Sequence, residues 1–134
     1  MRVVILGCGR LGARTAEVLD AAGHDVTVLD QDAGAFRKLS SAYRGRAVVG
    51  SGTDEDSLRQ ANVAEADVFI ALTVGDNTNI MASQVAKLAF LVPHVICQVK
   101  DPIRGEAYSA LGVTTICPTV LGVAALQKEL ERVG

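Results

Sequence analysis

Six short apolar runs, separated by segments with helical spacing, divide this 134-residue chain. Val, Ile, Leu and Ala predominate in the runs, and none of them approaches the roughly 18 apolar residues that a membrane-spanning helix needs. Runs that are apolar throughout are typical of strands buried on both faces of a parallel sheet. The six runs are Val3–Leu6, Val26–Leu29, Ala47–Val49, Val68–Leu72, Val95–Val99 and Thr114–Cys117.

The segments between the runs have the spacing of helices. They are Arg10–Ala22, Ala33–Tyr43, Asp54–Ala61, Asn77–Leu91, Gly105–Leu111 and Thr119–Val133. Strands that alternate with helices form right-handed βαβ units around a parallel sheet. We therefore predict an α/β fold of the Rossmann type, a doubly wound parallel six-stranded sheet in the order 3-2-1-4-5-6 with helices on both faces.

The composition excludes several classes of protein. Lys and Arg number 13 and Asp and Glu 15, a net charge of −2. Nucleic-acid binders usually carry a basic excess, so no nucleic-acid partner is expected. The three cysteines, Cys8, Cys97 and Cys117, are odd in number and form no CxxC pair, so neither a disulfide framework nor a zinc site is expected. Free cysteines suit a reducing cytosol.

A glycine-rich turn follows the first apolar run directly. Residues 7–12 read Gly-Cys-Gly-Arg-Leu-Gly and open the first expected helix, the context in which G-x-G-x-x-G indicates nucleotide binding. Gly7 permits a tight turn, Gly9 lets the backbone approach a pyrophosphate, and Gly12 allows the helix to pack against the strand. The free N–H groups of the first helical turn point at the phosphates. Arg10 is expected to contact a phosphate, either along the chain or at its γ end.

An acidic residue directly follows the second apolar run, at the end of the expected strand. Asp30 lies 18 positions after Gly12, where a carboxylate accepts hydrogen bonds from the ribose hydroxyls of an adenosine. The same charge repels a 2′-phosphate, so NADP is disfavoured.

The chain is not expected to be an enzyme. Its length fits one domain, without a substrate domain beside the nucleotide-binding fold. No Tyr-x-x-x-Lys pair is present, and His24 and His94 are expected in a turn and at a strand edge. The acids from Asp54 to Asp56 fit a first helical turn, where they favour the helix dipole, better than a metal site. We therefore predict no catalytic residue and no metal ligand.

An ordered series of later motifs resembles the TrkA-N domain, the N-terminal lobe of RCK (regulator of potassium conductance) proteins. These motifs are Gly50-Ser51-Gly52-Thr53, Ala66-Asp67 before the run ending at Leu72-Thr73, Asp76 with Asn79, Lys100-Asp101-Pro102, Gly112-Val113 and Cys117-Pro118-Thr119. RCK proteins are cytosolic subunits of Trk and Ktr potassium uptake systems and gating domains of potassium channels. The resemblance spans residues 1–119, and it implies a regulatory subunit that binds an adenine nucleotide to control a membrane pore.

The resemblance also implies which residues bind the nucleotide. They are Gly7, Cys8, Gly9, Arg10, Leu11 and Gly12 in the phosphate loop, Asp30 and Gln31 at the ribose, Ser51 and Gly52 at the adenine edge, and Leu72 and Thr73 at the wall after the fourth strand. Ser51 and Thr119 depart from the Asp and Glu that the family usually has there. Arg after the second glycine resembles family members that handle ATP and ADP, so ATP or ADP is slightly favoured over NAD(H).

Residues 120–134 form a separate terminal segment in this interpretation. Val123, Leu126, Leu130 and Val133 make an apolar stripe on one face of the last expected helix. The stripe either packs on the chain's own sheet or, as the resemblance implies, crosses to a second copy in a homodimer or larger ring.

The expected partners are a membrane potassium-translocating subunit and a C-terminal RCK lobe, supplied by a longer chain or a separate polypeptide. The expected location is the cytoplasmic face of the membrane. Two alternatives stay open: an NAD-dependent oxidoreductase whose catalytic part lies elsewhere, and a module that holds its nucleotide as a structural group.

Overall fold

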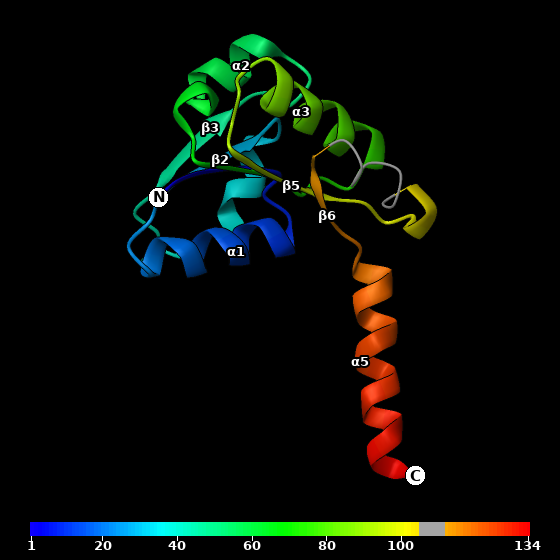
Figure 1. Cartoon of the computed structure of the whole chain (residues 1–134). Coiled ribbons are helices and arrows are strands. Elements are labelled where there is room, and N and C mark those ends of the chain that lie inside the picture. Colours follow the sequence, from blue (N-terminus) through cyan, green and yellow to red (C-terminus); the bar gives the residue numbers. More distant parts are fainter. Residues whose placement is uncertain (105–111) are drawn as a thin grey trace.

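A parallel six-stranded sheet forms the centre of the computed structural model, which describes residues 1–104 and 112–134 (Figure 1). The strand order is β3-β2-β1-β4-β5-β6 and every neighbouring pair is parallel, so the predicted order 3-2-1-4-5-6 is confirmed. The strands are β1 (Arg2–Leu6), β2 (Asp25–Asp30), β3 (Arg46–Val49), β4 (Val68–Ala71), β5 (His94–Gln98) and β6 (Thr114–Ile116).

Helices cover both faces of the sheet, as expected for a doubly wound fold (Figure 1). Helix α1 (Arg10–Ala21) and the 3₁₀ helix η1 (Ala33–Lys38) lie on one face, and helices α2 (Glu55–Gln60) and α3 (Asp76–Leu88) on the other. A short 3₁₀ turn, η2 (Val63–Glu65), leads into β4 and was not expected from the sequence.

Alternating residues of the strands supply two separate cores. Val3 and Ile5 of β1 pack in one cluster with Ala13 of α1, while Leu6 packs in the other with Ile80 of α3. All five side chains are buried. Burial on both faces explains why the strands are apolar throughout instead of alternating with polar residues.

One expected helix differs from the sequence prediction. The helix expected over Ala33–Tyr43 is a 3₁₀ helix that ends at Lys38, because Leu39 is extended and the following serines are weak helix formers. Tyr43 instead donates its hydroxyl to the carbonyl oxygens of Val26 and Arg46. The expected helix Gly105–Leu111 lies outside the described residues.

The terminal helix α5 (Pro118–Val133) extends away from the sheet (Figure 1). Every residue of α5 is described and none is buried; Leu126 and Leu130 are 66% and 68% exposed. Packing of the apolar stripe on the chain's own sheet, one of the two alternatives above, is therefore wrong. None of the described helices has the length and apolar character needed to span a membrane.

Candidate functional site

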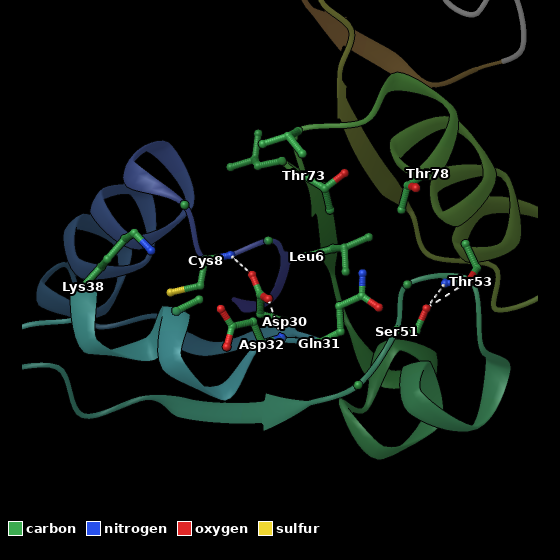
Figure 2. Close-up of a pocket in the computed structure, with 17 residues that line it drawn as sticks. Leu6, Cys8, Asp30, Gln31, Asp32, Lys38, Ser51, Thr53, Thr73 and Thr78 are labelled. Carbon is green, nitrogen blue, oxygen red and sulfur yellow. Dashed lines mark hydrogen bonds between the residues drawn. The ribbon is translucent and has the colours of Figure 1, made fainter.

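A cleft of about 350 Å³ opens at the carboxyl ends of β1, β2 and β4, where the strand order reverses (Figure 2). Ligands of open α/β sheets bind at this switch point. Figure 2 shows Asp30 and Asp32 below the glycine-rich turn, with Ser51 and Thr53 on one side and Thr73 and Thr78 above.

Nine of the twelve binding residues expected from the sequence line this cleft. They are Gly7, Cys8, Gly9, Asp30, Gln31, Ser51, Gly52, Leu72 and Thr73. Arg10, Leu11 and Gly12 do not line it: Arg10 and Leu11 are exposed on α1, and Gly12 is buried on the face of α1 that packs against Gly7. The lining residues that the sequence did not indicate are Leu6, Asp32, Ala35, Lys38, Gly50, Thr53, Val74 and Thr78.

The three glycines of the turn have different environments. Gly7 adopts φ +103°, and a Cβ there would lie 2.8 Å from the carbonyl carbon of Leu72. A Cβ on Gly12 would overlap the carbonyl oxygen of Gly7. A Cβ on Gly9 would meet no atom within 4 Å. The fold itself therefore requires Gly7 and Gly12, whereas Gly9 borders open space in which a ligand can approach the backbone.

The first turn of α1 has the character of an anion-binding site. Gly9 is the N-cap and supplies no side-chain hydrogen bond, and the first turn contains no acidic residue. The N–H groups at the start of a helix lack partners within the helix and carry partial positive charge. An anion beside Gly9 would supply the acceptors that the sequence omits.

Asp30 connects the glycine-rich turn to the segment after β2. One carboxylate oxygen accepts the N–H of Cys8 at 2.8 Å, and the other accepts the N–H of Asp32 at 2.8 Å. Each carboxylate oxygen has a second acceptor position, so Asp30 can still receive ribose hydroxyls. The residue thus positions the turn as well as being available to a ligand.

The turn after β3 is held by hydroxyl groups. The Ser51 hydroxyl lies 2.9 Å from that of Thr53 and accepts the Thr53 N–H at 3.2 Å. The Ser51 N–H donates to the Ser57 hydroxyl at 3.1 Å. Ser51 therefore maintains the turn through its hydroxyl and its backbone N–H.

A buried amide fixes the wall of the cleft after β4. Asn79 is fully buried, and its side-chain oxygen accepts the N–H of Thr73 at 2.8 Å and the Thr73 hydroxyl at 2.7 Å. Its side-chain nitrogen donates to the carbonyl oxygens of Thr73 and Gln98 at 2.9 and 3.1 Å. All of its donors and acceptors are engaged, which gives Thr73 one defined position.

The Cys8 side chain is buried, and its thiol pKa lies above the ordinary value, mainly because of burial and then because of the nearby Asp30 carboxylate. A protonated, buried thiol is a poor nucleophile. Cys8 therefore serves as a small, buried residue in the turn.

The acidic run at the start of α2 has structural contacts. Asp54 caps the helix by accepting the N–H of Asp56, and both Glu55 and Asp56 pair with Arg59. Among the described residues, no three His, Cys, Asp or Glu side chains gather as a metal site would require.

The sheet order, the glycine-rich turn at the switch point and the acidic residue at the end of β2 define a Rossmann-type domain. A family model described as the TrkA-N domain matches residues 3–119. The chain belongs to the TrkA-N domain family, as the motif order indicated.

Curated relatives carry the names of potassium uptake proteins. The Trk system potassium uptake protein TrkA of Streptomyces coelicolor is 46% identical over 87% of this chain and 52% of its own length. The TrkA homolog of Methanothermobacter thermautotrophicus is 32% identical over 98% of this chain and 61% of its own length. The chain thus spans about half the length of the curated relatives it matches.

Solved structures share the fold at low sequence identity. GsuK bound to ADP superposes with a TM-score of 0.83 at 22% identity, covering 99% of this chain and 34% of that one. The AMP-bound Kef CTD of Shewanella denitrificans superposes with a TM-score of 0.82 at 20% identity, covering 100% of this chain and 82% of that one. The GsuK channel bound to NAD superposes with a TM-score of 0.72 at 23% identity, covering 87% of this chain and 21% of that one.

Proposed function

We propose that this chain is a regulatory domain of a potassium uptake system or channel, without enzymatic activity of its own, that binds an adenine nucleotide to control a membrane pore. The observation that carries the proposal is the cleft at the switch point, where Gly9 borders open space and Asp30 faces the same opening. The names of the curated relatives support the assignment to potassium uptake.

Each part of the nucleotide has a matching group in the cleft. The phosphates bind at Gly9 and the first turn of α1, whose N–H groups favour anions. The ribose hydroxyls bind Asp30, and the adenine lies between the turn at Ser51 and the wall at Leu72. Exposed Arg10 reaches a terminal phosphate from outside the cleft.

ATP or ADP is the slightly favoured ligand, with NAD(H) next and NADP disfavoured because Asp30 repels a 2′-phosphate. Solved structures with the same fold are bound to ADP, AMP or NAD, which supports an adenine nucleotide in general. A control function requires that the nucleotide bind one conformation of the assembly better than another, since equal affinity shifts no equilibrium.

Hydrogen bonds link the first turn of α3, which borders the cleft, to the start of α5. Thr78, in the first turn of α3, lines the cleft, and Asp76 in the same turn accepts the N–H of Lys100 at 2.9 Å. The carbonyl oxygen of Lys100 in turn accepts the hydroxyl of Thr119, in the first turn of α5, at 3.4 Å. A shift of α3 on nucleotide binding would therefore reach α5 through groups in direct contact.

The apolar stripe of α5 is the proposed contact with a second copy of the chain, in a dimer or larger ring. A two-fold arrangement pairs the same surface of both copies, so one stripe covers the other. The pore subunit and a C-terminal RCK lobe are the further proposed partners, and they place the chain at the cytoplasmic face of the membrane.

Thermal unfolding with a panel of ATP, ADP, AMP, NAD, NADH and NADP tests the nucleotide assignment. A ligand that binds only the folded state raises stability by RT ln(1 + [L]/Kd), so the order of the shifts reports the order of affinities. The protein is first freed of bound nucleotide, with the removal checked by ultraviolet absorbance. We expect adenine nucleotides to raise Tm and NADP to have the smallest effect; no shift with any of them contradicts the proposal.

A further inference from the structure

Lys38 is the only lysine or arginine among the described residues that line the cleft. It ends the 3₁₀ helix η1, one turn after buried Ala35. Figure 2 shows its side chain on the same side of the cleft as Cys8, between η1 and α1. Arg10, to which the sequence assigned a phosphate contact, lies outside the cleft lining.

The positive charge of Lys38 has no counterion within the described part of the chain. Its side chain is exposed and forms no hydrogen bond or ion pair with a described residue. The acids beside it are occupied by backbone groups: Asp30 accepts the N–H of Cys8 and of Asp32, and Asp32 accepts the N–H of Gly34. The fold thus brings a free ammonium group to the cleft without using it structurally.

The ammonium of Lys38 lies on the side of the cleft formed by the glycine-rich turn and the first turn of α1. The pKa of the Cys8 thiol is raised by burial and by Asp30, and the ammonium of Lys38 opposes that rise, which places Lys38 within electrostatic range of the turn. The next residue, Gly9, borders open space, and the first turn of α1 offers unpartnered N–H groups. Within the cleft lining, an anion at this point would have the helix terminus and Lys38 as its sources of positive charge.

We infer that Lys38 binds a phosphate group of the adenosine ligand and thereby sets the preference of the cleft for phosphorylated adenosines. The inference rests on the proposed nucleotide-binding function. Two phosphates can occupy this region, the 5′-linked chain and a phosphate on the ribose. Asp30 lies at the ribose position and repels a phosphate there, so the 5′-linked phosphate is the expected partner.

Calorimetric binding of adenosine, AMP, ADP, NAD and NADP to the full chain tests this, with adenosine also measured by competition against ADP. We expect Lys38→Gln to weaken the binding of AMP and ADP about threefold to tenfold and to leave the affinity for adenosine unchanged. The effect is modest because an exposed charge-assisted contact is screened by salt. Lys38→Arg should keep the wild-type preference. The matched control is Arg37→Gln, which removes the same charge from the adjacent residue of η1, outside the cleft lining.

The outcomes separate this inference from the proposed function. If the wild type binds no adenine nucleotide, the proposed function fails and the role of Lys38 with it. If the wild type binds ADP and Lys38→Gln binds it equally well, only the role of Lys38 is overturned. Equal weakening of adenosine and ADP binding also overturns the role of Lys38, since an equal loss for both ligands indicates an altered structure. A loss confined to NADP shows that the partner is the ribose phosphate, and overturns the 5′ assignment.

Discussion

The carboxylate of Asp76 holds the backbone of Lys100, joining the first turn of α3 to the segment after β5. It accepts the N–H of Lys100 at 2.9 Å and the N–H of Asp101 at 3.3 Å. These two segments are separated by more than 20 residues in the chain, and their contact lies between the cleft and the start of α5. Asp76 thus forms one link between the cleft and α5, the two parts of the molecule that the proposed function requires to communicate.

Replacing Asp76 with Ala should destabilise the domain by about 1–3 kcal/mol, because two backbone donors lose a charged acceptor. Urea unfolding followed by circular dichroism measures the change. Asp56→Ala is the control, since Asp56 is also an acid in a first helical turn but is exposed and pairs only with Arg59. Equal effects of the two substitutions would show that the Asp76 contact is unimportant for stability.

Gly9 and Gly12 should respond differently to alanine. Gly9→Ala adds a Cβ to open space and should change stability by less than about 1 kcal/mol, while weakening nucleotide binding at least tenfold. Gly12→Ala forces a Cβ onto the carbonyl oxygen of Gly7 and should cost about 2 kcal/mol or more. Thermal unfolding and calorimetric titration with ADP measure both quantities. Unimpaired ADP binding by Gly9→Ala would place the phosphates elsewhere.

Asp30→Ala should abolish most of the Tm increase that adenine nucleotides produce, because the ribose hydroxyls lose their acceptor and the turn at Cys8 loses its anchor. Asp30→Asn separates these two effects, because its amide oxygen can still accept the Cys8 N–H. Asp25→Ala serves as the control, since Asp25 is an exposed acid at the opposite end of β2. An unchanged response to nucleotide in Asp30→Ala would remove Asp30 from the ribose site.

The apolar stripe of α5 should determine the oligomeric state. Leu126→Asp places a charge in the proposed contact, and burying a leucine side chain contributes about 1.5–3 kcal/mol, so dissociation of a dimer is expected. Sedimentation velocity over a range of concentrations detects it. Ala124→Asp introduces the same charge on the opposite face of the helix and should leave the assembly intact. A wild-type chain that is monomeric at all concentrations contradicts the proposed contact.

Much of the architecture was predictable because it depends on local pattern. Apolar runs that lack alternation indicate strands buried on both faces, and their alternation with helical segments leaves few topologies. Gly7 and Gly12 were assigned for the reasons that the structure confirms, a tight turn and close helix packing. The helix expected over Ala33–Tyr43 failed because weak helix formers and the contacts of Tyr43 ended it early.

Side-chain direction was less predictable. Arg10 lies within the glycine-rich motif, but Ala13 and Ala16 turn the buried face of α1 toward the sheet and leave Arg10 exposed outside the cleft lining. Lys38 belongs to no motif and reaches the cleft only because η1 folds beside α1. The hydrogen bonds around Asn79 could not be predicted from the sequence, because its partners Thr73 and Gln98 lie at the ends of two different strands.

The amino-acid sequence by itself determined the sheet, its strand order, the position of the glycine-rich turn and the acidic residue beside it, because each follows from spacing along the chain. Only the tertiary structure decided which basic side chain lines the cleft and where the last helix lies. Both depend on how distant segments pack. The stripe on α5 is equally apolar whether it covers the sheet or leaves it, and the structure places α5 away from the sheet with its apolar face uncovered.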